Sequence, residues 1–132
     1  MLLAIAALLS PALLFGAPPD ITPKTAAALV KEGKAVLVDV REPAEWKQTG
    51  VAAPAVLLAK SDFDARRKDW DKFLKTVGSK KIIVYCRSGA RAGVVAAALK
   101  KDGYDALNSG GLAAWEKAGL PVRKVKTGGS DH

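Results

Sequence analysis

One stretch, residues 82–95, constrains the fold of this chain more than any other. It begins with an apolar, largely β-branched run, Ile82-Ile83-Val84-Tyr85, which is typical of a buried strand in a parallel sheet. It then breaks at Cys86, the single cysteine among the 132 residues. A short loop of small and basic residues follows, and helical spacing runs from Val94 to Lys101 before it stops near Gly103. The sequence therefore predicts a strand, a tight loop and a helix, with Cys86 at the end of the strand.

The loop after Cys86 is suited to holding an anion. Backbone N–H groups are free at a helix N-terminus, and the helix dipole is positive there. Arg87 and Arg91 add two full positive charges. Such surroundings favour the thiolate, which is the nucleophilic form of cysteine. The alternative is that Cys86 is a small buried hydrophobe that ends a strand. An inert core thiol needs no electropositive loop, however, so we predict a nucleophilic cysteine in an anion-binding loop.

Strand and helix patterns alternate along the rest of the chain. A length of 132 residues suits one domain with a real core, and 49% hydrophobic residues exclude a disordered chain. Buried strands are predicted at residues 35–40 and 55–59, and a short last strand at 104–108. Helices are predicted after the N-cap Thr22, over residues 62–77 and after Gly110-Gly111. This alternation predicts an α/β fold, with a mostly parallel sheet flanked by helices on both faces.

Residues 1–17 are mostly apolar and carry no charged side chain. The segment is shorter than the roughly 20 apolar residues of a membrane span. It is typical of the apolar region of a secretory signal peptide. We therefore expect a periplasmic or secreted protein, with no stable membrane span once the signal is cleaved. Anchoring in a membrane through residues 1–17 and an N-terminal core helix are the alternatives.

The loop sequence Tyr85-Cys86-Arg87-Ser88-Gly89-Ala90-Arg91-Ala92 resembles the active-site loop of rhodanese-homology domains, the sulfurtransferases. Two further segments resemble that family and occur in the same order: Asp39-Val40-Arg41-Glu42 with Glu45-Trp46, and Gly110-Gly111-Leu112-x-x-Trp115 with Gly119-Leu120-Pro121-Val122. The resemblance is weaker at Val51, which stands where the family usually has a histidine. It covers residues 21–122, which we expect to form one rhodanese-like domain followed by a basic, flexible tail, residues 123–132.

The resemblance implies a role for each residue of the loop. In the family, the cysteine attacks a sulfur donor and carries the sulfur as a persulfide, so Cys86 is the expected catalytic residue. The residues expected to bind the donor or the persulfide are Arg87, Ser88, Gly89, Ala90 and Arg91. Arg91 either binds substrate or pairs with an acid such as Glu42. Asp39, Arg41 and Glu42 are expected to support the loop, because they follow the carboxyl end of a strand. No metal or organic cofactor is implied.

The resulting interpretation is a sulfurtransferase that moves a sulfane sulfur from thiosulfate, or a similar small anionic donor, to cyanide or a thiol. A protein is a further possible acceptor. Two alternatives stay open. One is a non-enzymatic persulfide carrier or protein-interaction module. The other is a phosphatase or arsenate reductase similar to the Cdc25-type enzymes, whose loop is one residue longer than the six residues from Cys86 to Arg91.

Other classes of function conflict with the residue content. The only histidine is His132, in the tail, so no Cys/His metal cluster is possible and a catalytic Cys–His pair is disfavoured. The formal net charge is +8, but basic and acidic residues are interleaved and no nucleic-acid motif is present. We therefore expect no nucleic-acid partner, and we expect the positive field to attract small anions.

Overall fold

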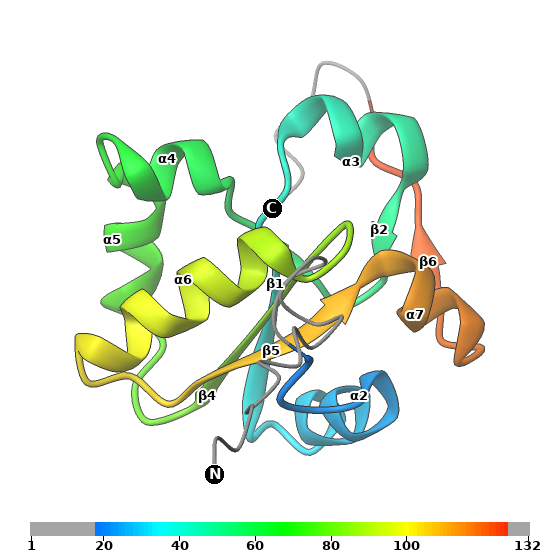
Figure 1. The fold of residues 1–132 in the computed structure, drawn as a ribbon, viewed down its shortest axis with the longest axis horizontal. Helices are drawn as coiled ribbons and strands as arrows, with labels where there is room; N and C mark the ends of the chain where they lie inside the picture. Colours follow the sequence, from blue (N-terminus) through cyan, green and yellow to red (C-terminus); the bar gives the residue numbers. More distant parts are fainter. Residues whose placement is uncertain (1–17, 127–132) are drawn as a thin grey trace, which may run out of the picture.

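The fold is organised around a four-stranded parallel sheet with the strand order β3-β1-β4-β5 (Figure 1). The computed structural model describes residues 18–126. The strands are β1 (Ala35–Asp39), β3 (Val56–Leu57), β4 (Lys81–Cys86) and β5 (Ala106–Gly111). The two central strands, β1 and β4, are almost entirely buried because they are covered on both faces, which explains their continuous apolar runs.

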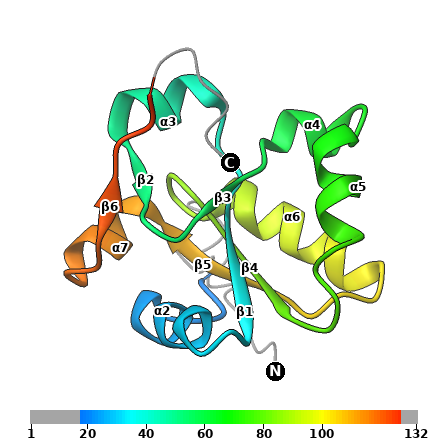
Figure 2. The same cartoon turned by 180° about the vertical axis from the view of Figure 1, so that it is seen from behind.

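Helices cover both faces of this sheet, as the sequence predicts. On one face lie α2 (Pro23–Lys31) and α7 (Leu112–Lys117), and their core includes Leu37, Ile83 and Trp115. The other face carries α4 (Lys60–Asp64), α5 (Lys68–Leu74) and α6 (Ala90–Lys101) (Figures 1 and 2). The predicted α/β fold with a parallel sheet between helices is confirmed.

Local signals set several helix ends. The Thr22 side chain caps α2 by accepting a hydrogen bond from the Thr25 N–H, and Pro23 occupies the first helical position. The next helix, α3 (Pro43–Thr49), also begins with a proline. It follows β1 directly and therefore lies at the carboxyl edge of the sheet, next to the end of β4 (Figure 1).

Three sequence-based predictions need correction. The strand predicted as buried at residues 55–59 is the two-residue β3, and Val56 is 37% exposed because β3 lies at the edge of the sheet. The helical connection predicted over residues 62–77 is two short helices, α4 and α5, separated at Arg67, which has a left-handed φ of 56°. The last strand begins at Ala106 and runs through both glycines to Gly111.

A small antiparallel sheet was not predicted. It pairs β2 (Val51–Ala52) with β6 (Val122–Arg123). Arg123, which the sequence places at the start of the tail, therefore belongs to a strand, and its guanidinium donates to the carbonyl oxygens of Ala53 and Ala55. These contacts tie the end of the domain to the loop between β2 and β3.

Two predictions concern residues outside the described part of the chain. These are the signal peptide at residues 1–17 and the end of the tail, residues 127–132. Between residues 18 and 126, no helix combines the length and the apolar character needed to cross a membrane.

Candidate active site

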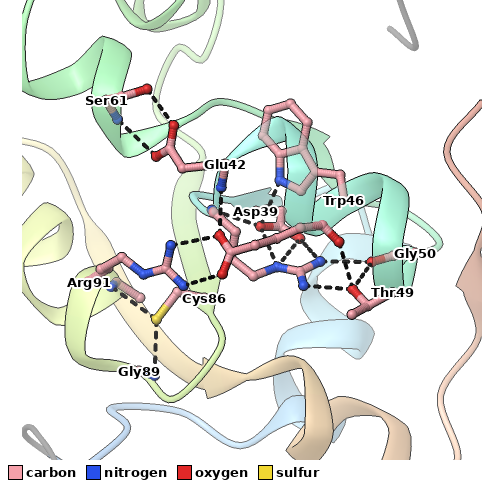
Figure 3. A network of polar contacts seen from close by, with 12 residues as sticks. Asp39, Glu42, Trp46, Thr49, Gly50, Ser61, Cys86, Gly89 and Arg91 are labelled. Carbon is pink, nitrogen blue, oxygen red and sulfur yellow. Dashed lines mark hydrogen bonds and ion pairs between the residues drawn. The ribbon is translucent and has the colours of Figure 1, made fainter. Parts of the chain in front are cut away.

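Cys86 is the last residue of β4, and a tight loop connects it to α6 (Figure 3). Gly89 makes the turn possible because its φ is +98°, a conformation that residues with a side chain rarely adopt. The turn brings two backbone N–H groups to the sulfur. The Gly89 nitrogen lies 3.0 Å from Cys86 Sγ and the Ala92 nitrogen lies 3.4 Å from it.

These contacts suit a negatively charged sulfur. Both donors belong to the first turn of α6 or its cap, where the N–H groups have no partner within the helix. The helix is 12 residues long, so its dipole adds a positive potential at the same point. Cys86 is completely buried, and the sulfur is therefore surrounded by protein donors rather than by bulk water.

The other loop residues differ in exposure. Arg87, Ser88 and Ala90 are exposed, whereas Gly89 is buried against β5. Arg87 also borders a cleft of about 340 Å³ between α3 and α7. The cleft is lined by Arg41, Glu45, Gln48, Thr49, Arg87, Leu112, Ala113 and Glu116. Within residues 18–126, Arg87 forms no ion pair, so its charge is available to an anion that enters the cleft.

Arg91 is engaged in an ion pair with Glu45 of α3. Its two terminal nitrogens each lie 2.8 Å from a carboxylate oxygen of Glu45 (Figure 3). The hydrogen bonds from Arg91 lower the pKa of Glu45 to about 2, and those with Glu45 raise the pKa of Arg91. Of the two roles left open for Arg91, the structure therefore shows ion pairing, and the partner is Glu45 rather than Glu42.

Glu42 is connected to the Cys86 loop through Glu45. Its carboxylate accepts hydrogen bonds from the backbone and the hydroxyl of Ser61, at the start of α4. Its backbone N–H donates to Glu45 at 2.9 Å. Glu42 therefore connects the segment after β1 to α4, and it touches neither Cys86 nor the loop around it through a hydrogen bond.

Asp39 and Arg41 form a buried ion pair beneath α3. Three atoms of Arg41, its backbone nitrogen among them, donate to the Asp39 carboxylate at 2.8–3.1 Å. Trp46 Nε1 donates to the same carboxylate at 3.1 Å, and Arg41 reaches Thr49 and the Gly50 carbonyl at 2.7 Å. Burial tends to lower the pKa of Arg41, but the hydrogen bonds and charge of Asp39 outweigh it and raise the pKa. The pair therefore holds α3 at Trp46 and at its C-terminal end, and α3 in turn carries Glu45.

Tyr85, next to Cys86 on β4, was predicted as part of the strand and of the loop sequence, but its hydrogen bond to β2 was not. Its hydroxyl accepts a hydrogen bond from the Ala52 N–H at 2.9 Å and links β4 to β2. Burial, followed by the charge of Asp39, raises the pKa of Tyr85, so the hydroxyl stays protonated. Within residues 18–126, no group of three His, Cys, Asp or Glu side chains is arranged to hold a metal ion.

Comparison with known proteins now identifies the family. The profile of the Rhodanese-like domain family matches residues 22–118. The chain belongs to the rhodanese-like domain family. The resemblance of the Cys86 loop is thus confirmed at the level of the whole domain. The hydrogen bonds to Cys86 described above therefore lie within the part of the chain that the family profile matches.

Several relatives of this rhodanese-like domain are named as sulfurtransferases. A sulfurtransferase of Allochromatium vinosum is 35% identical over 89 residues, which are 66% of this chain and 77% of that protein. The thiosulfate sulfurtransferase GlpE of Actinobacillus succinogenes is 30% identical over 106 residues, 78% of this chain and 88% of GlpE. The chain spans only 56% of a third relative, an uncharacterized Synechocystis protein that is 33% identical over 108 residues.

A solved structure agrees with these relatives. The polysulfide-sulfur transferase of Wolinella succinogenes has a TM-score of 0.62 and 27% sequence identity to this domain. The match covers 85% of this chain and 82% of that one. Together, the named relatives support sulfur transfer as the general activity of this rhodanese-like domain.

Proposed function

We propose that this rhodanese-like domain is an enzyme that transfers a sulfane sulfur from thiosulfate, or a similar anionic donor, through a persulfide on Cys86. The observation that carries the proposal is the position of Cys86 Sγ, which accepts hydrogen bonds from the backbone N–H groups of Gly89 and Ala92 at the start of α6. Such donors stabilise the thiolate before the reaction and the charged persulfide after it.

The reaction has two halves. In the first, the Cys86 thiolate attacks the outer sulfur of thiosulfate. A new S–S bond forms at Cys86 while the S–S bond of thiosulfate breaks, and its electron pair leaves with sulfite. In the second half, cyanide or a thiolate attacks the terminal sulfur of the persulfide. The products are thiocyanate or a new persulfide, and the Cys86 thiolate is regenerated.

Arg87 is the residue proposed to bind the donor. It is adjacent to Cys86, exposed, and free of ion pairs within the described residues, and it borders the cleft between α3 and α7. A guanidinium group in that position matches the oxygen atoms of thiosulfate and of departing sulfite. Arg91 is already neutralised by Glu45, so we assign it to holding the loop.

Intact mass spectrometry tests this proposal directly. The protein is measured before and after thiosulfate, and again after a cyanide chase. Because the chain has one cysteine, a gain of one sulfur atom can be assigned to Cys86. We expect the gain in the wild type, its removal by cyanide with release of thiocyanate, and neither in Cys86→Ser.

A control variant should leave the mass change intact. Glu32→Gln alters an exposed carboxylate that pairs with Lys34. Sulfur uptake that persists unchanged in Cys86→Ser would refute the mechanism. Uptake from polysulfide but not from thiosulfate would refute thiosulfate as the donor and retain the persulfide.

A further inference from the structure

A buried amide supports the Cys86 loop from behind. It is the side chain of Asn108 on β5, which is only 2% exposed. Asn108 Nδ2 donates to the Gly89 carbonyl oxygen at 3.0 Å, and its Oδ1 accepts from the Gly110 N–H at 2.8 Å. Asn108 therefore joins the loop to the end of β5 with its donor and its acceptor at the same time.

The loop and β5 are in direct backbone contact here. A Cβ atom at Gly111 would lie 2.0 Å from the carbonyl oxygen of Arg87, and one at Gly89 would lie 3.3 Å from the Cα of Gly110. Glycine is thus required for this approach. No side chain of the loop stands between the two backbones at these points, and the Asn108 bridge adds to the pairing of β4 with β5 that holds them together.

The Asn108 bridge also contributes to the orientation of the peptide plane between Gly89 and Ala90. The Gly89 carbonyl accepts from Asn108 and from the Gly93 N–H at 2.8 Å. In a trans peptide the C=O and the N–H point in opposite directions. Holding the Gly89 carbonyl against β5 consequently turns the Ala90 N–H away from β5. It also fixes Gly89, whose own N–H lies on the sulfur.

We infer that Asn108 is a positioning residue of this active site. It holds Gly89 so that the N–H groups of the loop face the sulfur of Cys86. An amide is suited to this task because it offers a donor and an acceptor on one short side chain. Leucine offers neither, and serine is too short to bridge both partners. The inference rests on the proposed role of Cys86 as the sulfur carrier.

Two uncharged substitutions test the inference, Asn108→Leu and Asn108→Ser. Since neither introduces a charge, a change in reactivity reports the lost hydrogen bonds. The matched control is Leu107→Ala, the preceding residue of β5, which packs into the core on the α2 side of the sheet. For each variant, the rate of Cys86 alkylation by iodoacetamide is followed against pH, with thermal unfolding as a measure of stability.

We expect the pH at which alkylation reaches half its maximal rate to move upward in both Asn108 variants. The lifetime of the persulfide formed with thiosulfate should fall about tenfold, less than the loss seen when a direct oxyanion donor is removed. Leu107→Ala should keep the wild-type profile and lifetime at a comparable loss of thermal stability.

A wild-type alkylation profile in a folded Asn108 variant would overturn the inference, and so would an equal shift in Leu107→Ala. If Asn108→Leu does not fold, the smaller Asn108→Ser decides. The alkylation assay does not depend on sulfur transfer. If wild-type protein takes no sulfur from thiosulfate, the proposed function fails, and the alkylation profile still decides the role of Asn108.

Discussion

Replacing Glu45 by glutamine removes the negative charge that holds Arg91 beside the Cys86 loop. The Glu45 carboxylate accepts two hydrogen bonds from Arg91 at 2.8 Å and one from the Glu42 N–H at 2.9 Å. The hydrogen bonds from Arg91 are the largest cause that lowers the pKa of Glu45, from 4.5 to about 2. The ionised form is therefore strongly favoured in the folded state.

The lowered pKa of Glu45 sets the size of the stability loss expected in Glu45→Gln. At about 1.4 kcal/mol for each pKa unit, the change corresponds to about 3 kcal/mol. The side chains of Glu45 and Arg91 are 28% and 34% exposed, and solvent screening reduces the contribution to about 1–2 kcal/mol. We expect Glu45→Gln to lower the free energy of unfolding by that amount at pH 7, and the melting temperature by about 4–8 °C.

The effect should depend on pH in a defined direction. A carboxyl whose pKa is lowered by folding stabilises the protein fully above its unfolded value and loses this contribution as pH falls through the folded value. The difference between wild type and Glu45→Gln should therefore be complete above about pH 4.5 and shrink towards pH 2. Urea unfolding at several pH values measures it.

Glu32→Gln is the control, because Glu32 and Lys34 form an ion pair that is 53% and 67% exposed. Its loss of stability should be below about 0.5 kcal/mol. Equal losses for the two variants at pH 7, or a loss in Glu45→Gln that stays constant down to pH 2, would refute the assigned strength of the Glu45–Arg91 pair.

Three further substitutions, one of them with a matched control, test other parts of the structure. Arg87→Ala should raise the KM for thiosulfate about tenfold and change kcat less, which steady-state kinetics would show, because it removes one charge-assisted contact. Gly111→Ala should lower the free energy of unfolding, measured in urea, by more than about 3 kcal/mol, since its Cβ would lie 2.0 Å from the Arg87 carbonyl oxygen. The control is Gly103→Ala, where the Cβ meets nothing within 4 Å. It should lower the free energy of unfolding by about 1–2 kcal/mol because Gly103 has a positive φ. Asp39→Asn should lower the free energy of unfolding by about 3–5 kcal/mol, because it leaves the buried charge of Arg41 unpaired.

The parts of the fold that depend on local chemistry were predictable from the sequence. The apolar run before Cys86 is the central strand β4, and Thr22 caps α2. The strand predicted at residues 55–59 was only partly right. Its apolar residues do not indicate that β3 lies at the sheet edge and pairs for only two residues, Val56 and Leu57. That position depends on the order of the strands, which hydrophobic periodicity does not encode.

The contacts of the site that join residues close in sequence could be predicted, and those that join distant residues could not. Asp39 and Arg41 are two residues apart, so their placement follows from the end of β1. The contacts of Tyr85 and Asn108 were missed because their partners lie 33 and 19 residues away along the chain. The pairing of Arg91 with Glu45 had a usable signal. That signal is the Glu45-Trp46 pair, which lies three residues after Glu42 and contains a second acidic residue that could pair with Arg91.

The burial of Cys86 limits what can react with it. The residue is 0% exposed, yet sulfur transfer requires an incoming atom to reach Sγ. Two of the residues around it are anchored: Gly89 by Asn108 and Arg91 by Glu45. Between Cys86 and the first anchor lie only Arg87 and Ser88, whose side chains are exposed and make no hydrogen bond within residues 18–126. A reactant therefore reaches the sulfur only when the protein around it moves, and Arg87 and Ser88 are the residues next to Cys86 that neither anchor holds. The anchors thus hold the loop around the sulfur, although neither Asn108 nor Glu45 makes a hydrogen bond to it.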